Sequence, residues 1–330
     1  MAIVKKKDLN FDNKKTEMVI YSRPGYGKTT LALSAPRPLL IDVEDGIGRV
    51  EACYHNTTMQ ADPSLAPGKK FEVFMHDLEN EDLSEFDTII VDTVGKVLEL
   101  LTPVVMAENS QNSQKDGRTL SLKGYGALAE RFKEFRNFLK SLNKNIIWLA
   151  HANETTDNEI VKVRLLIPGS TRETLLKDVD LCAYLEIQGK NRVLNFTPTE
   201  RYDAKGCFGI KGNFDIPVLK DAQNGGKLED NHFITDLFEV IISNISKSKE
   251  QYNANELIYN EAMKLKGAIA DCTCADDLNN VLELIGKTEH ALGSKEELRA
   301  HFGLKVKELG VVYDKQTKQY SDKPTETPTV

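Results

Sequence analysis

The sequence predicts an α/β fold with a mostly parallel central sheet, appended β-hairpins and a small C-terminal helical module. Over the first half of the chain, short apolar runs alternate with helical patterns, which is the signal for a parallel sheet. After residue 150 the apolar runs are separated by turn residues such as Gly189, which favours hairpins. From Phe233 onward the pattern is helical.

Continuous apolar runs are predicted to form the buried strands of the sheet. They are short and mostly rich in Val or Ile, which suits strands that are covered on both faces. They are Met18–Tyr21, Leu39–Val43, Thr88–Val91 and Asn145–Leu149. The segment Phe71–Met75 alternates between apolar and polar residues and predicts a more peripheral strand.

Helical patterns lie between these runs. They cover Lys28–Ser34, Lys96–Glu108 and Tyr125–Leu142. The last of them is amphipathic, so we expect its apolar stripe to pack against the sheet.

The later elements are predicted strands, a loop and helices. The strands are Ile160–Ile167, Leu181–Gln188 and Arg192–Thr197, and the Gly- and Asn-rich loop is Lys205–Gly226. The helices are Phe233–Ser243, Ala254–Ala270, Ala275–Ile285 and Ser294–Leu309.

These patterns divide the 330 residues into regions. Residues 1–16 are charged and predict a flexible N-terminal lead-in, and residues 17–245 predict the α/β domain. Residues 250–312 predict a helical module that carries no catalytic pattern. Residues 313–330 end in a polar stretch with two prolines and predict a disordered tail.

Composition bounds the function. A formal net charge of −7 argues against a globally basic nucleic-acid coat, although a local basic groove remains compatible with it. No apolar stretch approaches the ~20 residues of a membrane span, and the lysines near the N-terminus are not followed by an apolar core. Five scattered cysteines fit reduced thiols. We therefore expect a cytoplasmic protein without a membrane partner.

The most informative segment is SRPGYGKT, residues 22–29. It lies between a predicted strand and a predicted helix, which is the context of a phosphate-binding loop (P-loop). The glycines allow backbone N–H groups to surround a phosphate chain, and the start of the helix adds partial positive charge. Lys28 would reach the β- and γ-phosphates, and the Thr29 hydroxyl would ligate Mg²⁺.

The predicted nucleotide-binding residues are Ser22, Arg23, Pro24, Gly25, Tyr26, Gly27, Lys28, Thr29 and Thr30. Ser22 stands where the full motif has its first glycine, and a small residue still fits there. The alternative interpretation of the segment is a chance turn before a helix.

Asp92 is the predicted second metal ligand. It ends the run FDTIIVD, so an apolar strand would deliver its carboxylate beside the P-loop, where Mg²⁺ and its waters sit. The alternative is that Asp92 caps the helix that follows.

A hydrolase also needs a base that orients water, and the run PLLIDVEDG offers Asp42, Glu44 and Asp45. At the carboxyl edge of an open α/β sheet such a side chain faces the ligand crevice. Strand alternation puts Asp42 and Glu44 on the same side, so spacing leaves the choice between them open. A charged strand-to-turn edge without a catalytic role is the alternative for the whole group.

His151 closes the run IIWLAHA. At the tip of a core strand it could contact the γ-phosphate or the attacking water, or transmit the nucleotide state to the following segment. A lone histidine also fits a structural role.

Together the segments GYGKTT, LLIDVEDG, FDTIIVD and NIIWLAHA resemble the RecA-type branch of the P-loop ATPases. The resemblance covers residues 17–245. In particular, it resembles the small RecA-like ATPases of bacteriophages, often labelled AAA-domain or ATP-binding proteins, some of which act with phage annealing and recombination systems. It implies a RecA-like P-loop NTPase core that uses ATP and Mg²⁺.

The resemblance also implies roles. Glu44 rather than Asp42 matches the catalytic glutamate, Lys28 completes the catalytic set, and His151 matches the sensor that couples hydrolysis to DNA-binding loops. Ser22, and a histidine where recombinases often carry glutamine, depart from the pattern. No segment clearly matches the N-terminal oligomerisation segment of full recombinases.

The places of DNA-binding loops in RecA-like proteins correspond here to two polar segments. Glu108–Gly126 carries Lys115, Arg118, Lys123 and Tyr125, and Asn153–Lys177 carries Lys162, Arg164 and Arg172. Basic side chains can contact phosphates, and a tyrosine can stack on a base. Because acidic residues interrupt these charges, solvated surface loops are the alternative.

RecA-like ATPases usually complete their site with a cation from a neighbouring subunit, and Arg201 and Lys205 are the candidates here. An ordinary basic hairpin is the alternative.

We therefore expect a Mg²⁺-dependent ATPase that acts on or with DNA in phage recombination, strand annealing or replication, in the host bacterial cytoplasm. The implied partners are DNA, single-stranded rather than double-stranded, further copies in a ring or filament, and phage single-strand-binding or annealing proteins. The alternative is a nucleotide-switched scaffold or loader that hydrolyses ATP slowly. A small-molecule kinase is disfavoured, because no lid-like arginine cluster is evident.

Overall fold

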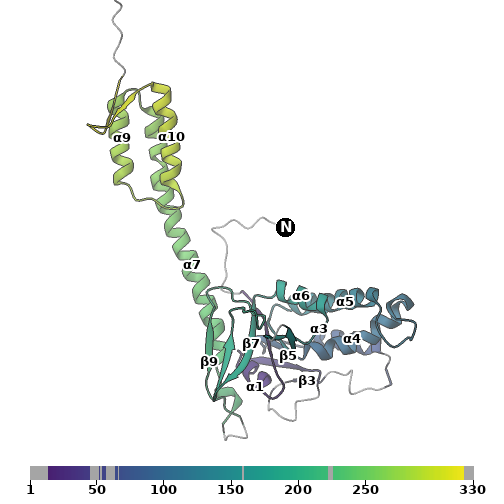
Figure 1. Cartoon of the computed structure of the whole chain (residues 1–330). Coiled ribbons are helices and arrows are strands. Elements are labelled where there is room, and N and C mark those ends of the chain that lie inside the picture. Colours follow the sequence, from purple (N-terminus) through teal and green to yellow (C-terminus); the bar gives the residue numbers. More distant parts are fainter. Residues whose placement is uncertain are drawn as a thin grey trace, which may run out of the picture. The chain divides into compact units, whose positions relative to one another are not determined.

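The computed structural model describes residues 14–44, 52, 54–56, 64–65, 67–157, 160–221 and 226–322 of the chain. The described chain divides after Asn244 into two units, and each is treated by itself. The first unit contains the central sheet, and the second contains helices and a short hairpin (Figure 1).

The sheet of the first unit has the strand order β3-β2-β4-β5-β1-β7-β8-β9. Its parallel strands are β1 (Glu17–Ser22), β2 (Pro38–Asp42), β3 (Tyr54–Asn56), β4 (Thr88–Asp92), β5 (Asn145–Asp157) and β7 (Leu181–Gln188). Antiparallel pairing adds β8 (Asn191–Asn195), β9 (Asn213–Ile216) and β6 (Ile160–Leu165). The predicted α/β fold, with its mostly parallel sheet and appended hairpins, is confirmed.

Strand register brings the predicted site residues to one edge of the sheet. Ser22 lies beside His151 in the β1–β5 pairing, and Asp42 lies beside Asp92 in the β2–β4 pairing. Parallel strands end at the same edge, which is where open α/β sheets bind ligands. The topology therefore gathers residues that are far apart in the sequence.

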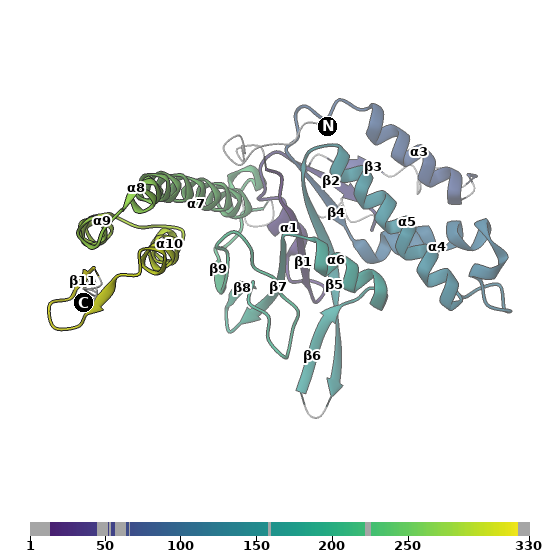
Figure 2. The ribbon, with the colours of Figure 1, turned by 90° about the horizontal axis from the view of Figure 1, so that it is seen from above.

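One face of the sheet is covered by α3 (Pro67–Asn80), α4 (Val94–Glu108), α5 (Leu122–Ser141) and α6 (Gly169–Asp178) (Figure 2). Val19 and Tyr21 of β1 belong to the apolar core on this face, together with residues of these helices. Met18 and Ile20 alternate to the opposite face and are also fully buried. Burial on both faces is why the central strand reads as a continuous apolar run.

The P-loop helix α1 (Lys28–Ala32) is joined to the start of the long helix α7 (Phe233–Met263) by hydrogen bonds. The backbone N–H of Ile234 donates to Ser34 Oγ at 3.0 Å, and the N–H of Thr235 donates to Ser34 O at 3.1 Å. The N–H groups in the first turn of a helix have no carbonyl acceptor within that helix. Ser34 therefore supplies the acceptors for two such N–H groups of α7.

Two predictions for the first unit are wrong. Phe71–Met75 belongs to α3, because Phe71, Phe74, Met75 and Leu78 follow the spacing of a helix face, and all four contribute to the core. The predicted loop Lys205–Gly226 contains β9, whose four residues pair with β8. Part of that loop, residues 222–225, lies outside the described residues, as do residues 1–13 of the predicted lead-in.

From Phe233 onward the structure differs from the prediction in two places. The predicted helices Phe233–Ser243 and Ala254–Ala270 are replaced by continuous α7 followed by α8 (Leu265–Asp271). Next come α9 (Ala275–Lys287) and α10 (Ser294–Leu309). The expected disorder from residue 313 is wrong up to residue 322, because β10 (Val312–Asp314) pairs with β11 (Gln319–Ser321) and Tyr320 contacts Phe302. Residues 323–330 are outside the described part.

Among the described helices, none combines the length and the apolar character that crossing a membrane requires.

Candidate nucleotide-binding and hydrolysis site

The P-loop connects the end of β1 to the start of α1. Gly25 and Gly27 have φ angles of 80° and 81°, in the left-handed region that glycine adopts at low cost. Ser22 is fully buried, and its hydroxyl donates to the Arg23 carbonyl at 2.9 Å. The loop therefore accommodates serine at the position of the motif's first glycine.

Lys28 is folded back onto this loop. Its Nζ lies 3.4 Å from the carbonyl oxygen and the hydroxyl of Ser22, and 3.3 Å from the Arg23 carbonyl. Burial lowers the pKa of Lys28, while the negative charges of Asp92 and Glu44 act in the opposite direction. The acceptors that hold this buried ammonium among the described residues are neutral oxygens, which the stronger acceptors of a phosphate can replace.

Thr29 and Asp92 meet where a metal ligand pair was predicted. The Thr29 hydroxyl donates to Asp92 Oδ2 at 2.7 Å, and Asp92 is only 8% exposed. Burial raises the pKa of Asp92, the Thr29 hydrogen bond opposes this, and the charge of Glu44 adds to it. Among the described residues, no cationic side chain lies at bonding distance from this buried carboxylate. A hydroxyl beside such a carboxylate fits Mg²⁺, which binds few protein oxygens and completes its shell with phosphates and water.

Glu44 and His151 are in direct contact. Nε2 of His151 lies 2.9 Å from Oε1 of Glu44, which also accepts a hydrogen bond of 2.8 Å from the Thr93 hydroxyl. The hydrogen bond from His151 is the main reason why the pKa of Glu44 falls to about 2, and partial burial opposes it. Glu44 is therefore a carboxylate at any physiological pH.

The acidic residues Asp42 and Glu44 of this run have different surroundings. The Asp42 side chain accepts the backbone N–H of Glu44 at 3.2 Å, so it supports the turn in which Glu44 sits. Asp45 lies outside the described residues. The Glu44 carboxylate, by contrast, faces the end of β5 and a pocket.

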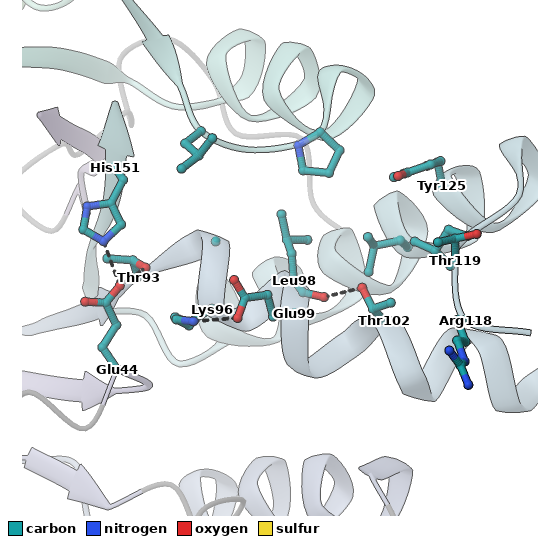
Figure 3. Close-up of a pocket in the computed structure, with 15 residues that line it drawn as sticks. Glu44, Thr93, Lys96, Leu98, Glu99, Thr102, Arg118, Thr119, Tyr125 and His151 are labelled. Carbon is teal, nitrogen blue, oxygen red and sulfur yellow. Dashed lines mark hydrogen bonds and ion pairs between the residues drawn. The ribbon is translucent and has the colours of Figure 1, made fainter. Parts of the chain in front are cut away.

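That pocket has a volume of about 620 Å³ and runs along α4. Glu44, Thr93 and His151 line one end, and Arg118 and Tyr125 line the other (Figure 3). The pocket therefore joins the predicted base and sensor to the first predicted DNA segment.

A family model described as an AAA domain matches residues 14–208. The chain belongs to the AAA-domain family of P-loop ATPases. The matched region of this AAA domain contains Lys28, Thr29, Glu44, Asp92 and His151. No curated protein matches the sequence.

The first predicted DNA segment of the AAA domain is partly structured. It contains the short 3₁₀ helix Ser110–Asn112, and α5 begins at Leu122. Lys115 and Arg118 are exposed, Tyr125 is 43% exposed, and Lys123 is hydrogen-bonded to Gln111. These side chains remain accessible to a partner.

The second predicted DNA segment, Asn153–Lys177, is not a loop. It forms the β5–β6 hairpin and most of α6. Lys162 and Arg172 are partly exposed. Arg164 donates to the carbonyls of Val163, Glu200 and Arg201 and lies 3.4 Å from Asp203, so its guanidinium is used within the domain.

The two cations predicted to reach a neighbouring subunit differ in their surroundings. Lys205 donates from Nζ to the carbonyls of Leu176, Lys177 and Val179, so it caps the C-terminal end of α6. Arg201 is 53% exposed and lies 3.7 Å from Glu186. Of the two, Arg201 is therefore the cation with fewer contacts inside the domain.

Arg23 of the P-loop forms an ion pair with Glu154 of β5.

The sequence analysis missed two residues of the site, Thr93 and Arg192. Thr93 contacts Glu44, and the signal for it was its position directly after Asp92. Arg192 of β8 lies against Gly27 of the P-loop. Its signal was the turn at Gly189, which returns the chain to the carboxyl edge of the sheet.

Proposed function

We propose that this AAA domain is a Mg²⁺-dependent ATPase in which Glu44 polarises the attacking water. The observation that carries the proposal is the convergence of Lys28, Thr29, Asp92 and Glu44 at one sheet edge. The low pKa of Glu44 keeps it ionised and able to accept a hydrogen bond from water.

Each residue has a separate task in this proposal. The ammonium of Lys28 binds the β- and γ-phosphates and stabilises their negative charge, and Thr29 and Asp92 hold the metal. The bound Mg²⁺ would neutralise phosphate charge as it develops. Glu44 orients water, and Thr93 and His151 determine the direction in which its carboxylate points.

His151 is the proposed sensor. It contacts Glu44 directly, and it lies at the point where β5 leaves the parallel sheet for the β5–β6 hairpin. A change in the Glu44 hydrogen bonds on nucleotide binding would therefore be felt by the strand that carries the hairpin.

We further propose that the protein acts on or with DNA, preferably single-stranded, as a ring or filament in phage recombination, annealing or replication. Support comes from Arg118 and Tyr125, which share a pocket with Glu44 and His151, and from exposed Arg201, which could complete a neighbouring site. The resemblance to phage RecA-like ATPases supplies the biological setting and the proposed phage single-strand-binding or annealing partners.

ATP hydrolysis with and without single-stranded DNA, at two salt concentrations, tests this proposal. We expect turnover that requires Mg²⁺, rises with DNA and loses its DNA stimulation at high salt, because phosphate contacts release counterions. The DNA role would be contradicted if DNA does not stimulate turnover and if no salt-sensitive binding of DNA is found. Absence of nucleotide binding would contradict the ATPase itself.

One observation favours a second candidate, a nucleotide-switched scaffold or loader with slow hydrolysis. The same oxygen of Glu44 is engaged by both His151 and Thr93, which competes with water for the carboxylate. Single-turnover rates with and without DNA separate the two functions. The scaffold is favoured if the hydrolysis rate stays slow with and without DNA and if the binding of partner proteins depends on the nucleotide state.

A further inference from the structure

Arg192 lies against the P-loop. A Cβ atom built on Gly27 would be 2.4 Å from Nη1 of Arg192 and 3.7 Å from its Cζ. Gly27 directly precedes Lys28, so the guanidinium occupies space next to the backbone that is expected to surround the phosphates.

The sheet topology holds Arg192 in this place. Strand β7 is parallel to β1, so its C-terminal end lies at the same edge as the P-loop. The turn at Gly189 and Lys190 then starts β8, where Arg192 pairs with Ile187 of β7 and Ile216 of β9. Because both neighbouring strands fix the backbone of Arg192, its side chain reaches the P-loop from a rigid element.

Within the described part of the chain, the guanidinium of Arg192 has no hydrogen bond or ion pair, although the residue is partly buried. Other arginines around the site have partners: Arg23 pairs with Glu154, and Arg201 lies near Glu186. A partly desolvated guanidinium without an acceptor favours an anion that supplies several oxygens.

We propose that Arg192 contacts the phosphate chain of the nucleotide bound to the same chain, as a second cation beside Lys28. This inference rests on the proposed function, because it uses the same nucleotide site. Arg192 is a binding residue in this proposal and acts within one subunit, unlike Arg201.

Calorimetric titration of the full-length protein with ADP and with a non-hydrolysable ATP analogue, in Mg²⁺, tests the proposal. Arg192→Ala should raise the Kd for both nucleotides by about 10- to 100-fold, the effect of losing a charge-assisted contact. Arg192→Lys keeps the charge without the planar fork and should recover part of the affinity. Lys190→Ala is the matched control, because it removes one exposed positive charge from the same turn.

The outcomes are distinguishable from failure of the proposed function. If the wild-type protein binds nucleotide and folded Arg192→Ala binds it equally well, this inference is wrong while the ATPase proposal stands. If Lys190→Ala weakens nucleotide binding as much as Arg192→Ala, the effect comes from the general positive charge of this turn, and the proposed contact is wrong. If the wild-type protein binds no nucleotide, both proposals fail. Should Arg192→Ala not fold, unchanged affinity of Arg192→Gln would overturn the inference.

A mixing experiment tests the same-chain assignment. Arg192→Ala retains Lys28, and Lys28→Ala retains Arg192. If Arg192 acts within its own subunit, mixing the two variants should not restore turnover above their separate values. Restored turnover would show that Arg192 acts across a subunit boundary and would overturn the assignment.

Discussion

Nε2 of His151 lies 2.9 Å from Oε1 of Glu44. The two residues are far apart in the sequence, and they meet because β5 and β2 flank β4 in the parallel sheet. Through this contact the residue proposed to activate water touches the residue proposed to report the nucleotide state. No intermediate side chain is needed for coupling between them.

Loss of the P-loop ammonium should abolish nucleotide use. Lys28→Ala removes the buried charge expected to bind the β- and γ-phosphates, and we expect turnover to fall by at least about 100-fold. Filter binding of ATP together with a phosphate-release assay checks this. Near-normal ATP affinity in the variant would contradict the assignment of the loop.

Glu44→Gln should separate binding from hydrolysis. The amide keeps the shape of the carboxylate but is a poor base, so we expect turnover to fall by about 100-fold or more while the Kd for ATP changes little. Steady-state and single-turnover kinetics measure the two quantities. Wild-type turnover would assign the base to another residue, and Asp42→Asn is the comparison.

The depressed pKa of Glu44 predicts a pH dependence of stability. Its folded-state pKa of about 2 lies below the ordinary value of 4.5, so its ionised form stabilises the native state. The extra stability of the wild-type protein over Glu44→Gln should be fully present above the ordinary pKa and decline as the pH falls toward 2. Urea unfolding of both proteins across this range measures the difference, and a pH-independent difference would contradict the contact with His151.

Asp92 should behave in the opposite way. Burial raises its pKa, so the ionised form costs stability as the pH rises through that pKa. Without Mg²⁺ and nucleotide at neutral pH, Asp92→Asn should therefore melt at a higher temperature than the wild-type protein. The same variant should lose Mg²⁺-dependent nucleotide binding. A lower melting temperature would mean that the Thr29 hydrogen bond outweighs the cost of burial.

Arg118 provides a test of the DNA surface. If it contacts a phosphate, Arg118→Ala should weaken DNA binding and reduce the slope of log K against log salt by about 1. Fluorescence anisotropy with labelled single-stranded DNA at several salt concentrations measures the slope. Lys133→Ala on α5 is the control, since Lys133 is exposed outside the pocket. An equal change in both variants would favour a general charge effect.

Local chemistry explains what could be predicted. The apolar runs that form β1, β2, β4 and β5 indicate burial on both faces. Asp92 is the last residue of β4, so its place at the sheet edge could be predicted from the strand alone. Phe71–Met75 was predicted as a strand because its apolar residues alternate, but a run of five residues also fits one side of a helix. The structure places it in α3, where Phe74 packs in the core. The hairpin β10–β11 was missed because its pairing is stabilised by Phe302 of another element.

By itself, the sequence determined that this chain carries a P-loop, that a strand ends in Asp92, and that the core is an α/β sheet. These features depend on residues next to one another. Only the tertiary structure decided that Glu44 rather than Asp42 contacts His151, that Lys205 caps a helix, and that Arg192 lies on Gly27. Those relationships depend on strand order and register, which bring together side chains that no local pattern connects.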